Sequence, residues 1–219
     1  GADVAVADMN LASARETVAR IAAEGGKAHA VQADISKPGD IPAMIAAAET
    51  ALGQLDGLVL NVGIGVGGLG LEGTTPQDWD EVLGVNLRGP MLCCKAALPK
   101  LADGSPVVFI SSIAGLIAGS RLPAYDASKA ALGGLMRHVA LEGARRGIRA
   151  NIVAPGLVDT PLGRAATRGR PSRGRTPVPF GRQATGWEIA YAALFLISDE
   201  SVYVTAQTLA VDSGLTGIS

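Results

Sequence analysis

Aromatic residues are scarce in this sequence: they make up 4% of the 219 residues, whereas hydrophobic residues make up 48%. Any core must therefore consist mainly of aliphatic side chains and alanine. Neither sign of charge dominates, because 19 Lys and Arg stand against 20 Asp and Glu, a formal net charge of −1. This balance gives no argument for binding nucleic acid or an anionic membrane. The high apolar content also excludes a disordered chain.

Cysteine, histidine and long apolar runs are also lacking. Cys93 and Cys94 are adjacent, which excludes an ordinary disulfide between them and indicates reduced thiols in a helix or in the core. His29 and His138 show no metal-ligand spacing, so no metal site is expected. No apolar run reaches the roughly 18 residues that a membrane span requires, and no signal peptide is visible. The sequence thus predicts one soluble, cytoplasmic domain, residues 1–219.

Apolar strand-like runs alternate with helical segments along the chain, which is typical of an α/β fold with a parallel sheet covered on both faces. Strands are expected at 4–7, 28–33, 58–60, 107–110, 148–153 and 208–211. Helices are expected between the cap Asn10 and Gly25, from Pro42 to Leu52, from Pro76 to about Lys100 with a break near Pro90, at 124–146 and at 187–197.

Polar or turn residues stand at the ends of five of these strands. They are Asp8, Asp34, Asn61, the pair Ser111–Ser112, and the pair Pro155–Gly156. Ligands of open parallel sheets bind outside the carboxyl ends of the strands. Each of these residues taken alone is explained as a turn former or a helix cap. Together they predict a binding site at this edge of the sheet.

Tyr125 and Lys129 are four residues apart in an expected helix, so their side chains share one helix face. A neighbouring ammonium favours a phenolate, and the pKa of Tyr125 is therefore expected to fall below its usual value of about 10. A phenol with a lowered pKa is a usable general acid or base. Ser112 adds a hydroxyl that could bind a carbonyl oxygen.

From Gly1 to about Thr216 the chain resembles the short-chain dehydrogenases/reductases. The motifs that carry the resemblance, in order, are Val6–Asp8, Ala33–Ile35, Asn61–Gly63, Val85–Leu87, Ile110–Gly115, Tyr125–Lys129, Pro155–Thr160 and Val211–Gly214. The resemblance implies a single-domain Rossmann-type, doubly wound parallel sheet. It also implies an oxidoreductase that interconverts an alcohol and a ketone or aldehyde with NAD, NADP being possible.

The resemblance assigns catalytic roles to four residues. Tyr125 would be the general acid/base, Lys129 would lower its pKa and hold the nicotinamide ribose, and Ser112 would orient the substrate oxygen. Asn86 would help to hold a water that links Lys129 to solvent; alternatively, it only satisfies backbone groups of adjacent elements. The implied cofactor-binding residues are Asp8, Asp34, Ile35, Asn61, Gly63, Tyr125, Lys129, Pro155, Gly156, Val158 and Thr160.

Asp8 would meet the adenosine ribose, where a carboxylate accepts hydrogen bonds from two hydroxyls but repels a 2′-phosphate. This favours NAD over NADP. In the family the glycine-rich phosphate turn lies before this acidic residue, and only seven residues precede Asp8 here. We therefore expect about 25–30 further residues in the natural protein, with a first strand, the glycine turn and a first helix.

Further expectations concern the substrate and its surroundings. The segments 69–75 and 113–122 are mainly apolar and would line the entrance, which favours a small alcohol or carbonyl substrate with apolar character. A mobile substrate lid is expected at about 161–182, where six arginines either stay in solvent or attract an anionic substrate. The family commonly forms homotetramers, so a tetramer or dimer is expected. The alternative function is an inactive dinucleotide-binding or scaffold protein of the same fold.

Overall fold

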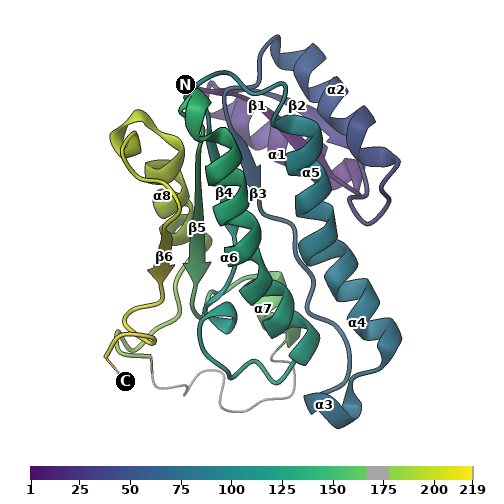
Figure 1. The fold of residues 1–219 in the computed structure, drawn as a ribbon, viewed down its shortest axis with the longest axis vertical. Coiled ribbons are helices and arrows are strands. Elements are labelled where there is room, and N and C mark those ends of the chain that lie inside the picture. Colours follow the sequence, from purple (N-terminus) through teal and green to yellow (C-terminus); the bar gives the residue numbers. More distant parts are fainter. Residues whose placement is uncertain (167–177, 219) are drawn as a thin grey trace.

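The computed structural model describes residues 1–166 and 178–218. Its strands form two parallel sheets (Figure 1). The smaller sheet pairs β1 (Asp3–Asp8) with β2 (Lys27–Gln32). The larger sheet has the order β3-β4-β5-β6, with bounds Leu58–Leu60, Pro106–Ile110, Arg149–Pro155 and Thr208–Val211. Every pairing is parallel, as expected, with Leu58 opposite Val107 and Pro106 opposite Arg149.

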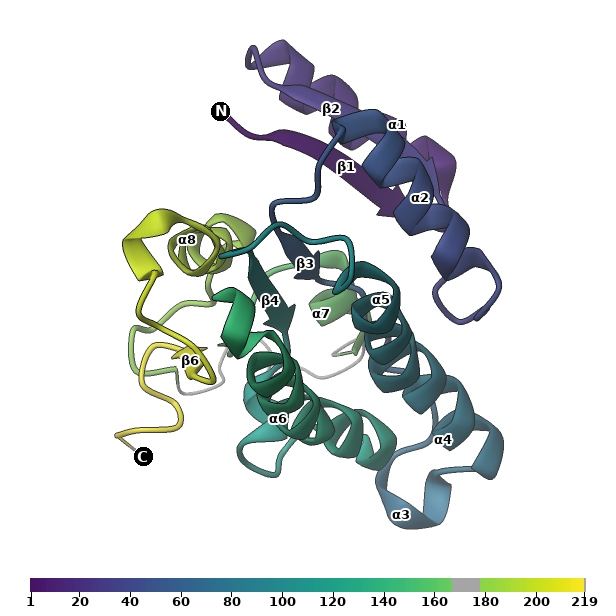
Figure 2. The ribbon, with the colours of Figure 1, turned by 45° about the horizontal axis from the view of Figure 1, so that its top comes forward.

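Within the described residues the two sheets do not pair with each other. As a result, β1 and β3 each have one edge without a partner strand. The arrows of β1, β3 and β4 nevertheless point the same way in Figure 2. The carboxyl ends of these strands therefore face one side of the molecule, which is where ligands of such sheets bind.

Helices cover both sheets and account for most of the remaining chain. The longer ones are α1 (Leu11–Ala23), α2 (Asp40–Leu52), α4 (Pro76–Leu83), α5 (Gly89–Ala97), α6 (Pro123–Gly143) and α8 (Gly186–Ile197). Short elements are α3 (Gly70–Gly73), α7 (Pro161–Ala166), a π-helical turn η1 (Gly84–Arg88), and the 3-10 turns η2 (Ile113–Gly115), η3 (Ala144–Arg146) and η5 (Asp199–Ser201).

Local sequence signals set the helix boundaries as expected. The Asn10 side chain caps α1 by accepting hydrogen bonds from the backbone N–H groups of Ala12 and Ser13. Gly53 ends α2 with a φ of 79°, a value that favours glycine. Pro76 occupies the first turn of α4. The predicted break near Pro90 is the π-helical turn η1, which separates α4 from α5.

The central strands are apolar on both faces because helices pack on both sides. Val107 and Phe109 of β4 point into the main core, which α2, α5 and α6 complete. Val108 of the same strand packs instead with Val153 and with Ile189 of α8. Side chains alternate between the faces of a strand, so this arrangement requires apolar residues at every position of β4. The expected α/β fold with parallel strands and helices on both faces is confirmed, but the described strands form two sheets instead of one.

Candidate active site

Ser112 and Tyr125 are brought together by the segment that follows β4. Ser112 caps η2, where its Oγ accepts a hydrogen bond from the Ala114 backbone N–H at 3.1 Å. The chain then returns and enters α6 at Pro123, which places Tyr125 in the first turn of that helix. The Ser112 hydroxyl comes close enough to the Tyr125 phenol to lower its pKa. The two hydroxyls thus lie next to each other at the carboxyl end of the sheet.

Lys129 lies one turn further along α6 and is only 5% exposed. Its Nζ is 5.7 Å from the centre of the Tyr125 ring and donates a hydrogen bond to the Ile110 carbonyl at 3.1 Å. The Ser111 hydroxyl in turn donates to the Lys129 backbone carbonyl at 2.9 Å. The end of β4 therefore holds both the side chain and the backbone of Lys129.

Asn86 is completely buried in η1, and its amide is used by the protein itself. Its Oδ1 accepts from the Ile64 backbone N–H at 2.8 Å, while its Nδ2 donates to the Ile64 carbonyl at 2.9 Å and to Ser128 Oγ at 3.0 Å. Ser128 Oγ then donates to the Tyr125 backbone carbonyl at 2.7 Å. Asn86 thus ties the loop after β3 to the helix of Tyr125, which corresponds to the alternative role considered above. The water-holding role stays a prediction.

Three glycines allow backbone segments to approach these side chains closely. A Cβ atom at position 63 would lie 2.9 Å from Lys129 Nζ, and one at position 65 would lie 3.5 Å from the Tyr125 ring. A Cβ at position 115 would lie 2.7 Å from the Lys129 carbonyl group. A Cβ at position 115 would meet fixed backbone, so space requires Gly115, whereas a Cβ at position 63 would meet the end of the Lys129 side chain and force it to shift.

Burial dominates the ionisation of the two central groups. It lowers the pKa of Lys129 to about 8. Burial also raises the pKa of Tyr125, which the Ser112 hydrogen bond lowers and the charge of Asp126 raises further. The expectation that Lys129 brings the pKa of Tyr125 below its usual value is therefore wrong for this structure. Sequence spacing located the ammonium, but it could not reveal how deeply both groups are buried.

The segment predicted to hold the nicotinamide end of the cofactor, residues 155–160, begins at the last residue of β5. Pro155 is the last residue of β5, and Gly156 continues the ladder by donating its N–H to the Val211 carbonyl at 3.0 Å. Val158 forms a parallel bridge with Ala184. The Thr160 hydroxyl accepts from the Gly163 N–H at 3.1 Å at the start of α7. This cap is also what a purely structural role of Thr160 requires.

The residues predicted to contact the adenosine part of the cofactor lie at or just after the ends of β1, β2 and β3. Asp8 ends β1 and accepts a hydrogen bond from the Asn10 N–H at 2.8 Å. Asp34 accepts from the N–H and the hydroxyl of Ser36, and these bonds hold its pKa below the usual range. Ile35 packs on the main core beside Gly89, and Asn61 is exposed.

The predicted lid at about 161–182 is described only in part, because residues 167–177 lie outside the described residues. Arg168, Arg170, Arg173 and Arg175 belong to that range. Arg164 forms a two-bond ion pair with Asp159, and Arg182 forms one with Glu188. Arg164 and Arg182 are therefore each paired with a carboxylate at one end of the segment. Attraction of an anionic substrate by this segment stays a prediction.

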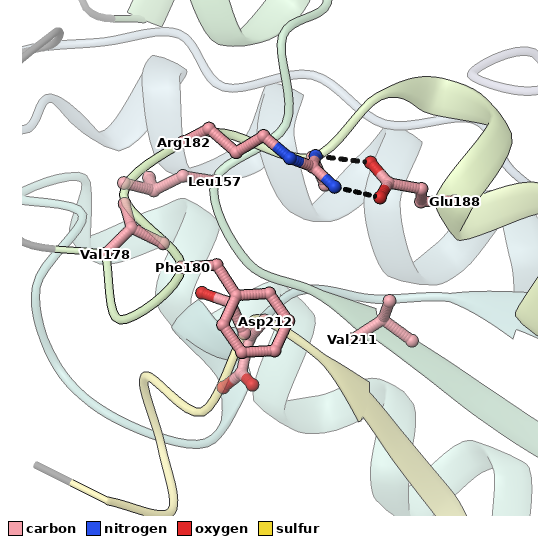
Figure 3. A pocket seen from close by; sticks show the side chains of 9 residues that line it. Leu157, Val178, Phe180, Arg182, Glu188, Val211 and Asp212 are labelled. Atoms are coloured by element: carbon pink, nitrogen blue, oxygen red, sulfur yellow. Dashed lines mark hydrogen bonds and ion pairs between the residues drawn. The ribbon is translucent and has the colours of Figure 1, made fainter.

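A small cavity of about 100 Å³ lies beside the nicotinamide segment (Figure 3). Its walls include Leu157, Val178, Phe180, Val211 and Asp212, with the Arg182–Glu188 pair at one side. Ligand sites for molecules of drug size are several times larger. The cavity lies where residues 178–184 pack against Leu157 and the end of β6, and by itself it is too small for a ligand of that size.

Several residues of this arrangement received no role from sequence reasoning. Ser111, Ser128, Gly65 and Gly115 all lie within segments that were singled out, but their contacts depend on how those segments meet in space. Cys93 and Cys94 are buried in α5 as expected, and burial raises their pKa values to about 11 and about 12. Such thiols stay protonated and are poor nucleophiles. In the described residues no cluster of potential metal ligands occurs, and none of the described helices is long and apolar enough to span a membrane.

Known proteins resemble the chain over nearly its whole length. The family model described as enoyl-(acyl carrier protein) reductase matches residues 1–216. The chain belongs to the short-chain dehydrogenase/reductase family. It is 36% identical to 2-(S)-hydroxypropyl-CoM dehydrogenase 3 of Xanthobacter autotrophicus, with 100% of this chain and 88% of that protein covered. It is 38% identical to inactive 2-(S)-hydroxypropyl-CoM dehydrogenase 2 of the same organism, covering 100% of this chain and 96% of that protein.

Solved structures of this dehydrogenase/reductase family have the same fold. A blue fluorescent protein from a metagenomic library, in complex with NADPH, superposes with a TM-score of 0.90 at 33% identity. The superposition covers 99% of this chain and 88% of that one. The Rossmann-like fold and the membership among the family's oxidoreductases are thereby established.

The burial of Lys129 predicts how the stability of the protein depends on pH. Between pH 8 and pH 10.5 the unfolded chain keeps the proton on this lysine, whereas the folded chain has lost it. The free energy of unfolding therefore rises with pH in this window, by about 3 kcal/mol relative to a Lys129→Met variant. Urea unfolding of both proteins at a series of pH values measures the difference. The exposed Lys95→Met is the control and should show no such trend, while a flat or falling difference for Lys129 would contradict the prediction.

Proposed function

We propose that the protein is an NAD(P)-dependent oxidoreductase that interconverts an alcohol and a ketone or aldehyde, with Tyr125 as general acid/base. The observation that supports this most is that the Ser112 and Tyr125 hydroxyls are neighbours, with the Lys129 ammonium 5.7 Å from the centre of the phenol ring. A carbonyl oxygen placed between the two hydroxyls can accept hydrogen bonds from both. A proton can then move between this oxygen and Tyr125 Oη.

The residues around Lys129 fit a nicotinamide dinucleotide. The ammonium has three donors, and one of them is used by the Ile110 carbonyl. Space beside Nζ exists because position 63 has no Cβ, so hydroxyl groups of a ribose have room to approach. Lys129, Gly63 and the 155–160 segment would hold the nicotinamide end, whose chemistry is the transfer of a hydride. Ser112 fixes the substrate oxygen, and Lys129 favours the phenolate when Tyr125 gives up its proton.

The substrate proposal is a hydroxy or oxo compound with apolar character. The loop after β3 and the segment after η2 meet above Tyr125, because the Gly70 N–H donates to the Arg121 carbonyl at 2.9 Å. Large apolar side chains are exposed on both segments: Val66, Leu69, Leu71, Leu116 and Ile117. Exposed apolar surface next to a polar pair favours a ligand that buries it. A cytoplasmic location stays a prediction from the sequence.

A second candidate is a catalytically inactive, dinucleotide-binding member of the family, since one 38% identical relative bears a name that begins with "inactive". The buried contacts of Lys129 and Asn86 would serve a folded scaffold equally well. The Ser112–Tyr125 pair favours the enzyme, because neither hydroxyl is needed for the packing of α6.

Replacing Tyr125 by Phe separates the two candidates. The ring and its packing remain, but the acid/base is lost, so turnover should fall by about 10²–10⁴-fold. Turnover is measured as the change in nicotinamide absorbance with a panel of secondary alcohols and ketones, and dinucleotide binding by calorimetry should persist. The exposed Tyr191→Phe is the control. A Tyr125→Phe enzyme with most of its activity would refute the mechanism, and dinucleotide binding without turnover for any panel member would favour the inactive candidate.

Asp8 leads us to propose NAD as the preferred cofactor. Its carboxylate ends β1 and forms no ion pair with any residue in 1–166 or 178–218. It can therefore accept hydrogen bonds from ribose hydroxyls and repel a 2′-phosphate. Hydrogen bonds to charged groups contribute about 1.5–3 kcal/mol. The ratio of kcat/KM with NAD to kcat/KM with NADP should therefore fall by roughly tenfold or more in Asp8→Ala. Asp3→Ala, at the other end of β1, is the control. An NADP preference of the unmodified protein would overturn the assignment.

A homo-oligomer, a tetramer or dimer, is proposed as well. Trp187, Tyr191 and Leu194 follow each other at helical spacing on α8 and are 72%, 65% and 60% exposed. Large exposed apolar patches are typical of interaction surfaces. The mass in solution, measured by light scattering, should be a multiple of 22.1 kDa. Tyr191→Lys should lower it, and Leu71→Lys in α3 should not. A monomer would rule the proposal out.

A further inference from the structure

The loop after β3, residues 62–70, is held near both of its ends by contacts with other parts of the chain. Near its start, Asn86 bonds both backbone groups of Ile64. At its end, the Gly70 N–H donates to the Arg121 carbonyl at 2.9 Å. The stretch between these two points is the part of the loop whose position remains to be explained.

This middle stretch contains the loop residues that lie against the phenol. A Cβ atom at position 65 would lie 3.5 Å from the Tyr125 ring, so the backbone of Gly65 is close to that ring. Val66 and Leu69 follow, and their side chains are exposed. Both belong to the apolar surface that the proposed function assigns to the substrate. The position of Val66 therefore affects how a substrate fits beside Tyr125.

Asp78 of α4 contacts the middle stretch at Gly67. A Cβ atom at position 67 would lie 2.9 Å from both Cβ and Cγ of Asp78 and 3.2 Å from its Oδ2. The φ of Gly67 is 105°, a value that favours glycine. The loop backbone therefore lies directly against the Asp78 side chain, at the residue that follows Val66.

The capping box of α4 holds the Asp78 carboxylate in this place. Its Oδ2 accepts hydrogen bonds from the Thr75 N–H at 3.0 Å and from the Thr75 hydroxyl at 2.8 Å, and the Asp78 N–H donates to Thr75 Oγ1 at 3.1 Å. Helix α4 packs on α6, and its Val82 is completely buried. Asp78 thus has a fixed position relative to the helix that carries Tyr125.

We propose that Asp78 is a positioning residue that sets the place of Val66 beside Tyr125 and thereby controls how tightly the substrate binds. The inference rests on the proposed function. A helix cap alone explains the bonds between Asp78 and Thr75, but it does not require a loop glycine against the same carboxylate. Asp78 acts through Gly67, because a loop that is ordered before binding loses less conformational freedom when the substrate arrives.

The first test needs no substrate. Asp78→Ala removes the carboxylate that lies against Gly67. Asp78→Asn keeps its shape, and because Oδ2 alone makes both bonds with Thr75, one amide oxygen can replace it. Measured by NMR, amide exchange of Gly70 should be about fivefold faster or more in Asp78→Ala and nearly unchanged in Asp78→Asn. The Ile64 N–H, which Asn86 holds, is the internal reference.

Thr75→Ala is the matched control for this exchange experiment. It removes the hydroxyl of the same capping box, but the backbone N–H of residue 75 still holds the Asp78 carboxylate. Both Thr75→Ala and Asp78→Ala weaken the cap of α4, and only Asp78→Ala should loosen the loop at Gly70. Unchanged exchange in Asp78→Ala would overturn the proposal. So would an equal acceleration in Thr75→Ala, since the effect would then be one of helix capping.

The second test separates KM from kcat for a ketone of the panel at saturating dinucleotide. Asp78→Ala should raise KM by about threefold or more and leave kcat within about twofold, because the groups that carry out the reaction are untouched. Asp78→Asn should restore most of the affinity. Asn10→Ala, which removes the side-chain cap of α1, is the control for lost stability and should leave KM unchanged.

Three outcomes of the second test would overturn the proposal. They are an unchanged KM in the folded Asp78→Ala variant, a fall in kcat without a change in KM, and an equal rise of KM in Asp78→Asn. The last of these would mean that the charge matters and not the contact. If no ketone or alcohol of the panel is turned over, the proposed function fails, while the exchange experiment still decides whether Asp78 holds the loop.

Discussion

The hydrogen bond from the buried Lys129 ammonium to the Ile110 carbonyl is the contact around which the site is organised. A cation with 5% exposure is costly unless polar groups surround it. The carboxyl end of β4 supplies such a group, because the last carbonyls of a strand have no partner further along the ladder. Together with the Ser111 hydroxyl, which donates to the Lys129 carbonyl, this hydrogen bond ties the first turns of α6 to the end of β4 and so helps to set the position of Tyr125.

Close packing around that lysine explains why the loops are rich in glycine. Gly115 approaches the Lys129 backbone at a distance where a Cβ cannot be placed, and Gly63 lies against the end of the Lys129 side chain. The backbone after β3 is then held by Asn86, whose amide satisfies both the N–H and the carbonyl of Ile64. The π-helical turn that interrupts the helix at Gly84–Arg88 contains Asn86. Such turns are frequent at functional sites, because they change which residues of a helix point inward.

Much of this arrangement follows from the sequence. The strand ends, the cap Asn10, Pro76 in the first turn of α4 and the break near Pro90 are local signals, and the structure agrees with them. The pairing of Tyr125 with Lys129 also follows from helical spacing. The direction in which the pKa of Tyr125 moves does not, because it depends on burial and on the Ser112 hydroxyl, which reaches the ring from another element. Contacts between distant segments, such as Asn86 with Ser128, leave no trace in local spacing.

The chemistry proposed for the site therefore depends on several opposing effects on the pKa of the Tyr125 phenol. Burial and Asp126 oppose the phenolate, whereas the Ser112 hydrogen bond supports it. The Lys129 ammonium supports it only while it remains charged, and burial has brought its pKa to about 8. Near neutral pH the site thus holds a neutral phenol beside a cation, which is an arrangement suited to donating a proton. Above that range Lys129 loses its charge before the Tyr125 phenol ionises. A phenolate therefore forms most readily when Tyr125 gives its proton directly to a substrate oxygen that is bound between Ser112 and Tyr125.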